Sequence, residues 1–298
     1  MFHGSIPALV TPFGEDRAFD ESAFRTSVDW QIGHGSAALL ACGTTGEAAT
    51  LSIFEHGRVL EICVEQAAGR VPVIAGCNSN NTLAALAQIH AAKAHGATAA
   101  LVAAPGYSRP NQEGIFRHFE VLARDGGLPI LLHNVPARSV TDIHVETMLR
   151  IVVAFPEVVV GVKDATGVLS RVSKQRLACG PAFCQLSGND DTALAHAAMG
   201  GKGCISVTAN VAPKLCAQFQ AACEEGDYAK ARTYQDLLFP LHTALASDAS
   251  PGPIKYALTR VRPDFPGSLR LPMTWPSERS RGSVDAALAH AGLLSGRR

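Results

Sequence analysis

The 298-residue sequence has no run of 18 uninterrupted apolar residues, so we expect no membrane-spanning helix. It also lacks net charge: 26 basic residues balance 26 acidic ones, which leaves no field to attract nucleic acid or an anionic membrane. Its eleven histidines form no H-E-x-x-H pattern, and no group of histidines and cysteines has zinc spacing. We therefore expect no metal site, and a small molecule as the partner.

Three other signatures are also missing. The segment Gly200–Gly203 completes neither a Walker motif nor G-x-G-x-x-G, so we expect a turn into a strand and no cofactor. The eight cysteines include no C-x-x-C pair and lie mostly in apolar runs, which favours buried free thiols over disulfides. Residues 1–5 show no basic stretch leading into an apolar one, so we expect no secretory signal and a cytoplasmic location.

The chain alternates regularly between strand-like and helix-like segments. Eight short β-rich runs recur, at Ile6–Val10, Ala37–Ala41, Val71–Gly76, Ala99–Ala103, Pro129–Asn134, Val158–Lys163, Ala182–Gly188 and Gly203–Val207. Between them lie segments with helical periodicity, such as Ile53–Ala68, Thr82–His95, Gln112–Arg124 and Asp191–Met199. Repeated strand-helix units with continuous apolar strands predict an α/β fold, a (β/α)8 TIM barrel. A doubly wound open sheet is the alternative, but it more often carries the dinucleotide glycine fingerprint.

More helical segments follow the eighth strand. They cover roughly Ala212–Glu225, Tyr228–Ala246, Gly252–Val261 and Val284–Leu294. One of them must complete the barrel, and the others predict a C-terminal helical extension. We expect the barrel to span residues 1–225 and the extension to span 226–298.

Lys163 is the most informative single residue. It ends the apolar run Val158–Lys163, whereas the other six of the seven lysines stand in polar helix-like or loop-like contexts. Partial burial disfavours the ammonium form, and a neutral lysine forms Schiff bases with ketones and aldehydes. The alternative is a structural lysine paired with a carboxylate such as Asp164.

Other unusual residues also follow strand ends, which meet at one face of such a barrel. The second strand leads into 43–47, Gly-Thr-Thr-Gly-Glu, whose hydroxyls and amides suit a small carboxylate. The fourth strand leads to Tyr107, the fifth ends at His133 and leads to Arg138, and the seventh ends at 187–190. Taken singly, each has a structural alternative. The segment 43–47 also fits a capped turn, and Tyr107 a surface aromatic. His133 also fits a core histidine, and Arg138 a solvated cation.

Together these motifs resemble the dihydrodipicolinate synthase / N-acetylneuraminate lyase family over nearly the whole chain. The residues that carry the resemblance are Gly43–Glu47, Tyr107–Pro110, Asn134–Arg138, Gly161–Gly167 and Gly203–Val207. The resemblance implies that pyruvate condenses with L-aspartate semialdehyde to give 4-hydroxy-tetrahydrodipicolinate. It also leaves open a class I aldolase or lyase that acts on another aldehyde or a 2-keto-3-deoxy acid.

The resemblance assigns roles to individual residues. Lys163 would form an imine with pyruvate, and Gly43, Thr44 and Thr45 would hold the pyruvate carboxylate. Arg138 would bind the aldehyde's carboxylate. It also implies that Gly188 and Ile205 contact substrate. Tyr107 would reach into the neighbouring subunit to complete a proton relay with Thr44, which predicts a homo-oligomer, a dimer of dimers.

His133 departs from the family, which has the central tyrosine of the relay at this position. An unperturbed imidazole has a pKa near 6.5, much closer to working pH than that of a phenol. Three interpretations remain: a synthase with an altered pH profile, a relative that uses another aldehyde or runs in the cleavage direction, and a weak paralogue. Arg138 favours the first, whereas Ser139-Val140 in place of the more usual Thr-Gly weakens it.

A second departure concerns feedback by lysine. His56 and Asn80 match the inhibitor pocket of lysine-sensitive relatives, but Ile53, Ala84 and Gly106 replace a histidine, a glutamate and a tyrosine. We therefore expect no inhibition by lysine, because the bound ammonium would lack its carboxylate partner.

Other function classes are less well supported. A barrel that binds a keto acid without turnover remains an alternative to catalysis. A phosphate-handling barrel is disfavoured, because no glycine-rich phosphate loop follows the seventh strand.

Overall fold

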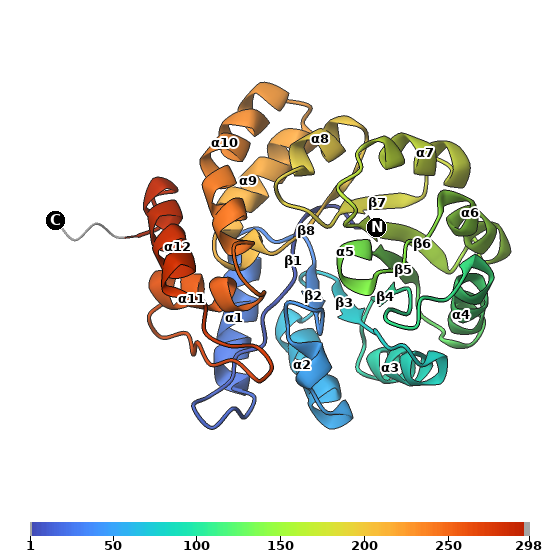
Figure 1. Cartoon of the computed structure of the whole chain (residues 1–298), viewed down its shortest axis with the longest axis horizontal. Helices are drawn as coiled ribbons and strands as arrows, with labels where there is room; N and C mark the ends of the chain where they lie inside the picture. Colours follow the sequence, from blue (N-terminus) through green and yellow to red (C-terminus); the bar gives the residue numbers. More distant parts are fainter. Residues whose placement is uncertain (1, 295–298) are drawn as a thin grey trace.

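The computed structural model describes residues 2–294 and confirms the predicted (β/α)8 barrel. Its strands are β1 (Gly4–Pro7), β2 (Leu39–Ala41), β3 (Val73–Gly76), β4 (Ala99–Ala103), β5 (Ile130–Asn134), β6 (Val159–Asp164), β7 (Cys184–Ser187) and β8 (Gly203–Ser206). All neighbouring strands pair in parallel. A bridge between Ala8 and Leu40 joins β1 to β2 and closes the ring (Figure 1).

The helices surround this ring. They are α1 (Glu21–Gly33), α2 (Ile53–Ala67), α3 (Thr82–Ala94), α4 (Gln112–Asp125), α5 (Pro136–Ser139), α6 (Val145–Ala154), α7 (Ser170–Cys179), α8 (Ala193–Ala198), α9 (Pro213–Glu224), α10 (Tyr228–Leu245), α11 (Gly252–Val261) and α12 (Glu278–His290), with short 3-10 turns η1 (Ala48–Thr50) and η2 (Thr208–Asn210). No helix within residues 2–294 is long and apolar enough to cross a bilayer.

The last helix begins earlier than the sequence predicts, at Glu278 rather than near Val284. Ser277 caps it by accepting a hydrogen bond from the Ser280 amide, and the first turns are polar. Apolar periodicity does not detect a helix that begins with polar turns, because only the capping residue marks its first residue.

Helix α9 follows β8 and packs on β1, so it is the eighth helix of the barrel. Helices α10, α11 and α12 continue beyond it, and Figure 1 shows α11 and α12 outside α1. Their apolar side chains, including Leu238, Leu241 and Ile254, form one cluster with Val10 and Ala209 of the barrel. The extension therefore shares a core with the barrel.

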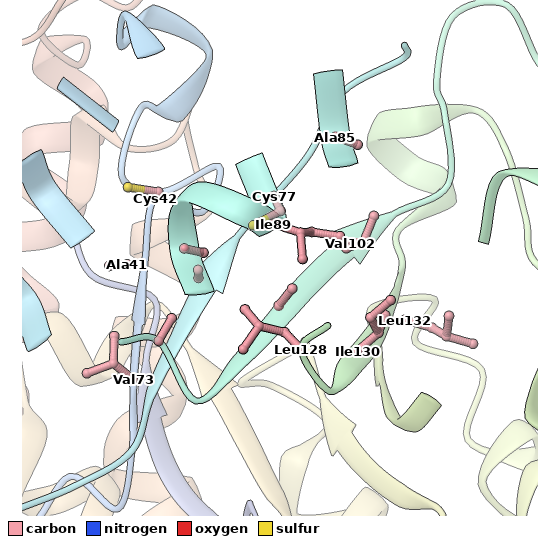
Figure 2. Close-up of a cluster of buried hydrophobic side chains, with 14 of the residues drawn as sticks. Ala41, Cys42, Val73, Cys77, Ala85, Ile89, Val102, Leu128, Ile130 and Leu132 are labelled. Carbon is pink, nitrogen blue, oxygen red and sulfur yellow. The ribbon is translucent and has the colours of Figure 1, made fainter. Parts of the chain in front are cut away.

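The outward faces of the strands pack against the surrounding helices. Figure 2 shows Ala85 and Ile89 of α3 over the strands that carry Val102 and Ile130. The burial of each larger side chain among them, Ile89, Val102 and Ile130, contributes roughly 1.5–3 kcal/mol to the stability of the fold. The eight cysteines are all free, as predicted, and most are buried in such clusters.

A bulge in β6 decides which side chains face the barrel interior. Ile130 pairs with Val159, but the next residue, Leu131, pairs with Gly161, so Val160 is left without a partner in the ladder. His133 then pairs with Lys163. A Cβ atom at Gly161 would lie 2.2 Å from the Cys184 carbonyl oxygen, so only glycine fits there.

Candidate active site

A cavity of about 610 Å³ opens at the carboxyl ends of the strands. Predicted residues that line it are Gly43, Thr44, Thr45, His133, Arg138, Lys163 and Gly188. They come from the ends of four strands, β2, β5, β6 and β7, and from the segments that follow them, as expected for the catalytic face of a barrel. The structure thus brings together seven of the nine predicted site residues, all except Tyr107 and Ile205.

Lys163 is half-buried at the end of β6 and faces this cavity. Its pKa is lowered to about 8, mainly by burial and to a smaller extent by the nearby Arg138, while Cys204 and Asp190 act in the opposite direction. Among residues 2–294, no carboxylate lies within 4.0 Å of the amine. About a tenth of the amine is therefore neutral, and nucleophilic, at pH 7.

Asp164, the residue that follows, points to the other side of the strand. Its carboxylate accepts hydrogen bonds from Thr166 Oγ1 at 2.6 Å, Arg171 Nε at 3.0 Å and Gln175 Nε2 at 2.6 Å. The alternative interpretation, a structural pair between Lys163 and Asp164, does not hold, because Asp164 is occupied by other partners.

His133 is buried beside Lys163. Burial holds its pKa well below the ordinary value, and the positive charges of Lys163 and Arg138 lower it further. The pKa of His133 therefore lies further from working pH than that of an unperturbed imidazole. The imidazole is neutral, so it can accept a proton at one nitrogen and donate one from the other without a resting charge.

The loop 43–47 forms a tight turn at the end of β2. The Gly46 amide donates to the Gly43 carbonyl at 3.0 Å, and the Glu47 amide donates to the Thr44 carbonyl at 3.1 Å. Glu47 has a left-handed backbone with φ of 53°, which costs roughly 1–3 kcal/mol for a residue other than glycine. Thr44 is exposed and Thr45 is buried, and both line the cavity.

Two other residues shape the space around the amine. A Cβ atom on Gly188 would lie 2.6 Å from Ala165 Cβ and 3.1 Å from Lys163 Cε, so glycine leaves room for the lysine. Arg138 lies on the short helix α5 at the exposed rim. In the described part of the chain its guanidinium has no hydrogen-bond or ion-pair partner, which leaves it free to bind an anion.

Tyr107 and Ile205 do not line the cavity. The Tyr107 side chain is 94% exposed, and its backbone is left-handed with φ of 56°. Ile205 is fully buried in the interior of the barrel below the cavity. Tyr107 is therefore a surface side chain in this chain, and Ile205 is a core residue.

Sequence reasoning missed the contribution of the C-terminal extension. Cavity residues from this part of the chain include His242, Thr243, Leu245, Ala246, Ser247, Ser250 and Ile254. Asp190 was also overlooked, although it lies in the segment 187–190 noted above. Its carboxylate accepts hydrogen bonds from the Ser206 hydroxyl and from the Val207 amide at 2.9 Å. An acidic residue three positions after the end of a strand is the available signal for it.

Lys255 corrects a second expectation. The sequence placed it in a polar context, but its side chain is 0% exposed and its pKa is lowered to about 8 by burial. Its ammonium lies 2.6 Å from Glu47 Oε1. The chain thus has two lysines of lowered pKa, and only Lys163 reaches the cavity.

Comparison with known proteins decides the family. The model of the dihydrodipicolinate synthetase family matches residues 1–291. The chain belongs to this family. Among curated members, the 4-hydroxy-tetrahydrodipicolinate synthase of Rhizorhabdus wittichii is 64% identical over 98% of this chain and 100% of its own.

Solved structures of the dihydrodipicolinate synthetase family have the same fold. The dihydrodipicolinate synthase of Aquifex aeolicus superposes with a TM-score of 0.95 at 36% identity, covering 99% of this chain and 100% of its own. A monomeric dihydrodipicolinate synthase variant gives 0.95 at 32% identity, over 98% of both chains. Family membership therefore does not by itself determine the number of subunits.

Proposed function

We propose that the protein is a pyruvate-dependent, Schiff-base-forming synthase that condenses pyruvate with L-aspartate semialdehyde to 4-hydroxy-tetrahydrodipicolinate. The observation that carries this proposal is the Lys163 amine, whose pKa is about 8, in a cavity with two threonine hydroxyls and an arginine that have no side-chain partner within residues 2–294. The full-length relative at 64% identity bears the name of this activity. Its similarity favours the synthase over an aldolase with another acceptor.

The first half of the reaction uses pyruvate. The neutral Lys163 amine attacks the ketone carbon, water leaves, and a protonated imine forms. This imine withdraws electrons from the adjacent methyl group, which loses a proton and becomes the nucleophilic carbon of an enamine. Thr44, Thr45 and the amides of their loop hold the pyruvate carboxylate and thereby orient the ketone towards the amine.

The second half uses the aldehyde. The enamine carbon attacks the aldehyde carbon of L-aspartate semialdehyde, and the new alkoxide takes up a proton. The amino group of that substrate then attacks the imine carbon, which closes the ring and displaces the Lys163 amine. Arg138 binds the semialdehyde carboxylate through a forked pair of hydrogen bonds.

His133 takes the central place in the proton relay between these steps. Because its imidazole is neutral, one nitrogen receives the proton while the other releases one. Thr44 lies on one side of the relay, and Tyr107 from a neighbouring subunit completes it. We therefore include a homo-oligomer, a dimer of dimers, in the proposal.

Exposed apolar side chains on α2 and α3 support this assembly. They include Ile53 (54%), Phe54 (86%) and Leu83 (70%). Exposed apolar groups of this kind favour burial against another chain. The proposed place in the cell is the cytoplasm, and the proposed pathway is the diaminopimelate route to lysine, as the relative's name implies.

The test is steady-state turnover with pyruvate and L-aspartate semialdehyde, followed by borohydride reduction with pyruvate and peptide mapping. We expect turnover of order 1–100 per second and a reduced adduct on Lys163. An adduct without turnover would indicate another aldehyde or a keto-acid binder. No adduct on Lys163 would refute the proposed chemistry.

A further inference from the structure

A buried ion pair connects helix α11 to the loop 43–47. The Lys255 ammonium lies 2.6 Å from Glu47 Oε1 and donates a hydrogen bond to the Ser268 carbonyl at 2.7 Å. The side chains of Lys255 and Glu47 are only 0% and 1% exposed. Water does not screen this contact, so the attraction between the two charges is strong. Within residues 2–294 Glu47 Oε1 has no hydrogen-bond partner, so the ion pair with Lys255 is what compensates its charge.

Glu47 is the residue that closes the loop carrying Thr44 and Thr45. Its left-handed backbone persists only where its surroundings hold it there. Its carboxylate is held twice, at Oε1 by Lys255 and at Oε2 by the Arg270 amide at 3.0 Å. Both contacts come from the C-terminal extension, so the extension determines the geometry at the end of this loop.

Arg270 contacts the segment that follows the loop, at Thr50 and Glu55. Its guanidinium contacts both oxygens of Glu55, at 2.5 and 3.0 Å, and donates to the Thr50 carbonyl at 3.1 Å. The Phe13 ring lies near both cations, 4.3 Å from Lys255 Nζ and 4.1 Å from Arg270 Cζ. The loop is thus enclosed on its outer side by a fixed set of contacts.

Helix α11 also reaches the cavity directly. Ile254, the residue before Lys255, lines the cavity, as does Ser250 just before the helix. Lys255 itself has no access to substrate, because it is fully buried outside the cavity lining. Any shift of α11 would therefore move one cavity wall and the loop 43–47 together.

We infer that Lys255 is a positioning residue: through Glu47 it orients the loop that binds the substrate carboxylate. The inference rests on the proposed function, because it needs pyruvate at that loop. Stability alone gives little reason for such a pair, since apolar side chains of similar volume commonly replace buried ion pairs at no cost in stability. A positioning role gives this pair a purpose other than stability.

The test is Lys255→Met in the full-length enzyme, assayed well below its melting temperature. We expect the KM for pyruvate to rise at least tenfold and the KM for the aldehyde to stay within twofold. Borohydride should still trap pyruvate on Lys163 at saturation. Arg260→Met is the matched control, because Arg260 lies on the same helix but pairs with Asp285 of α12 at 2.9 Å. Its KM for pyruvate should stay within twofold of the wild type.

The double variant Glu47→Gln/Lys255→Met decides the question if the single variant does not fold. It removes both buried charges and keeps an amide oxygen for the Arg270 amide. We expect the same rise in KM with a smaller loss of melting temperature. A folded variant of either kind with an unchanged KM for pyruvate, and only a lower melting temperature, would overturn the inference. Wild-type enzyme without turnover or a Lys163 adduct would instead refute the proposed function.

Discussion

Two lysines in this molecule have the same lowered pKa, about 8, for the same leading reason, which is burial. Lys163 lies at the mouth of the barrel, has no carboxylate within ion-pairing distance in the described chain, and faces a cavity. Lys255 lies beneath the loop 43–47, is paired with Glu47, and faces none. A lowered pKa therefore does not identify a nucleophile, whereas access and the lack of a partner do.

Removing the accessible lysine should have the largest effect. Lys163→Ala deletes the nucleophile, so we expect turnover to fall more than about a thousandfold, with the melting temperature preserved or raised. The measurement is steady-state turnover alongside a thermal melt. Lys174→Ala, at an exposed lysine of α7, should keep full activity. Activity of the Lys163 variant above a hundredth of wild type would place the chemistry elsewhere.

Removing the paired lysine should lower stability as well as raise the KM for pyruvate. Lys255→Met leaves the Glu47 carboxylate buried without its cation, which we expect to cost roughly 3–5 kcal/mol of unfolding free energy. Lys163→Met, which breaks no pair, should cost less than about 1 kcal/mol. Urea denaturation of both variants measures the difference. Equal losses would mean that the two burial sites are energetically alike.

His133 lies beside Lys163, and in the proposed mechanism it carries protons to and from the reacting groups. His133→Phe removes the relay's proton carrier, so we expect kcat to fall about a hundredfold. His133→Tyr restores a hydroxyl and should stay within about tenfold of wild type. Because the pKa of His133 lies well below its ordinary value, neither change should shift the acid limb of the pH profile. A shift of that limb in both variants would show that His133 titrates in the working range.

The pH dependence of imine formation should follow Lys163. With a pKa of about 8, the neutral amine fraction rises about tenfold from pH 7 to pH 9, and so should kcat/KM for pyruvate.

Stability should also depend on pH. Because the folded pKa of both lysines lies below the unfolded value of 10.5, the unfolded chain binds more protons than the folded chain between pH 8 and 10.5. Their contribution to stability therefore rises with pH across that window.

The control for the pH profile of kcat/KM is the double variant Glu47→Gln/Lys255→Met. Its kcat/KM should be lower, but its pH midpoint should be unchanged if the limb belongs to Lys163. A profile that flattens in the double variant would assign the limb to Lys255.

Free lysine should have the smallest effect. His56 Nε2 is already bonded to the Gly76 carbonyl at 2.9 Å, and Asn80 Oδ1 accepts from the Gly106 amide at 2.8 Å. With Ala84 in place of a carboxylate, we expect less than a twofold change in rate at about 1 mM lysine. Half-maximal inhibition below that concentration would show that another pocket recognises the amine.

The sequence predicts Lys163 and its neighbours well, because parallel strands all end at one face and the informative residues follow those ends. The burial of Lys255 cannot be predicted in the same way. This lysine stands in an ordinary amphipathic helix pattern, and its burial depends on Glu47 and Arg270, which are distant in sequence. His242 and Ile254 are missed for the same reason: their position in the cavity arises from packing of the extension on the barrel.

The bulge at Val160 has a consequence for anyone who redesigns this barrel. Side chains alternate along a strand, so one unpaired residue reverses the parity of everything after it. If Val160 were drawn into the ladder with Val159 kept in place, Val162 and Asp164 would turn towards the axis. Lys163 would then face the outer helices. An idealised, perfectly regular β6 would thus preserve every amino acid of the motif and still be an inactive enzyme.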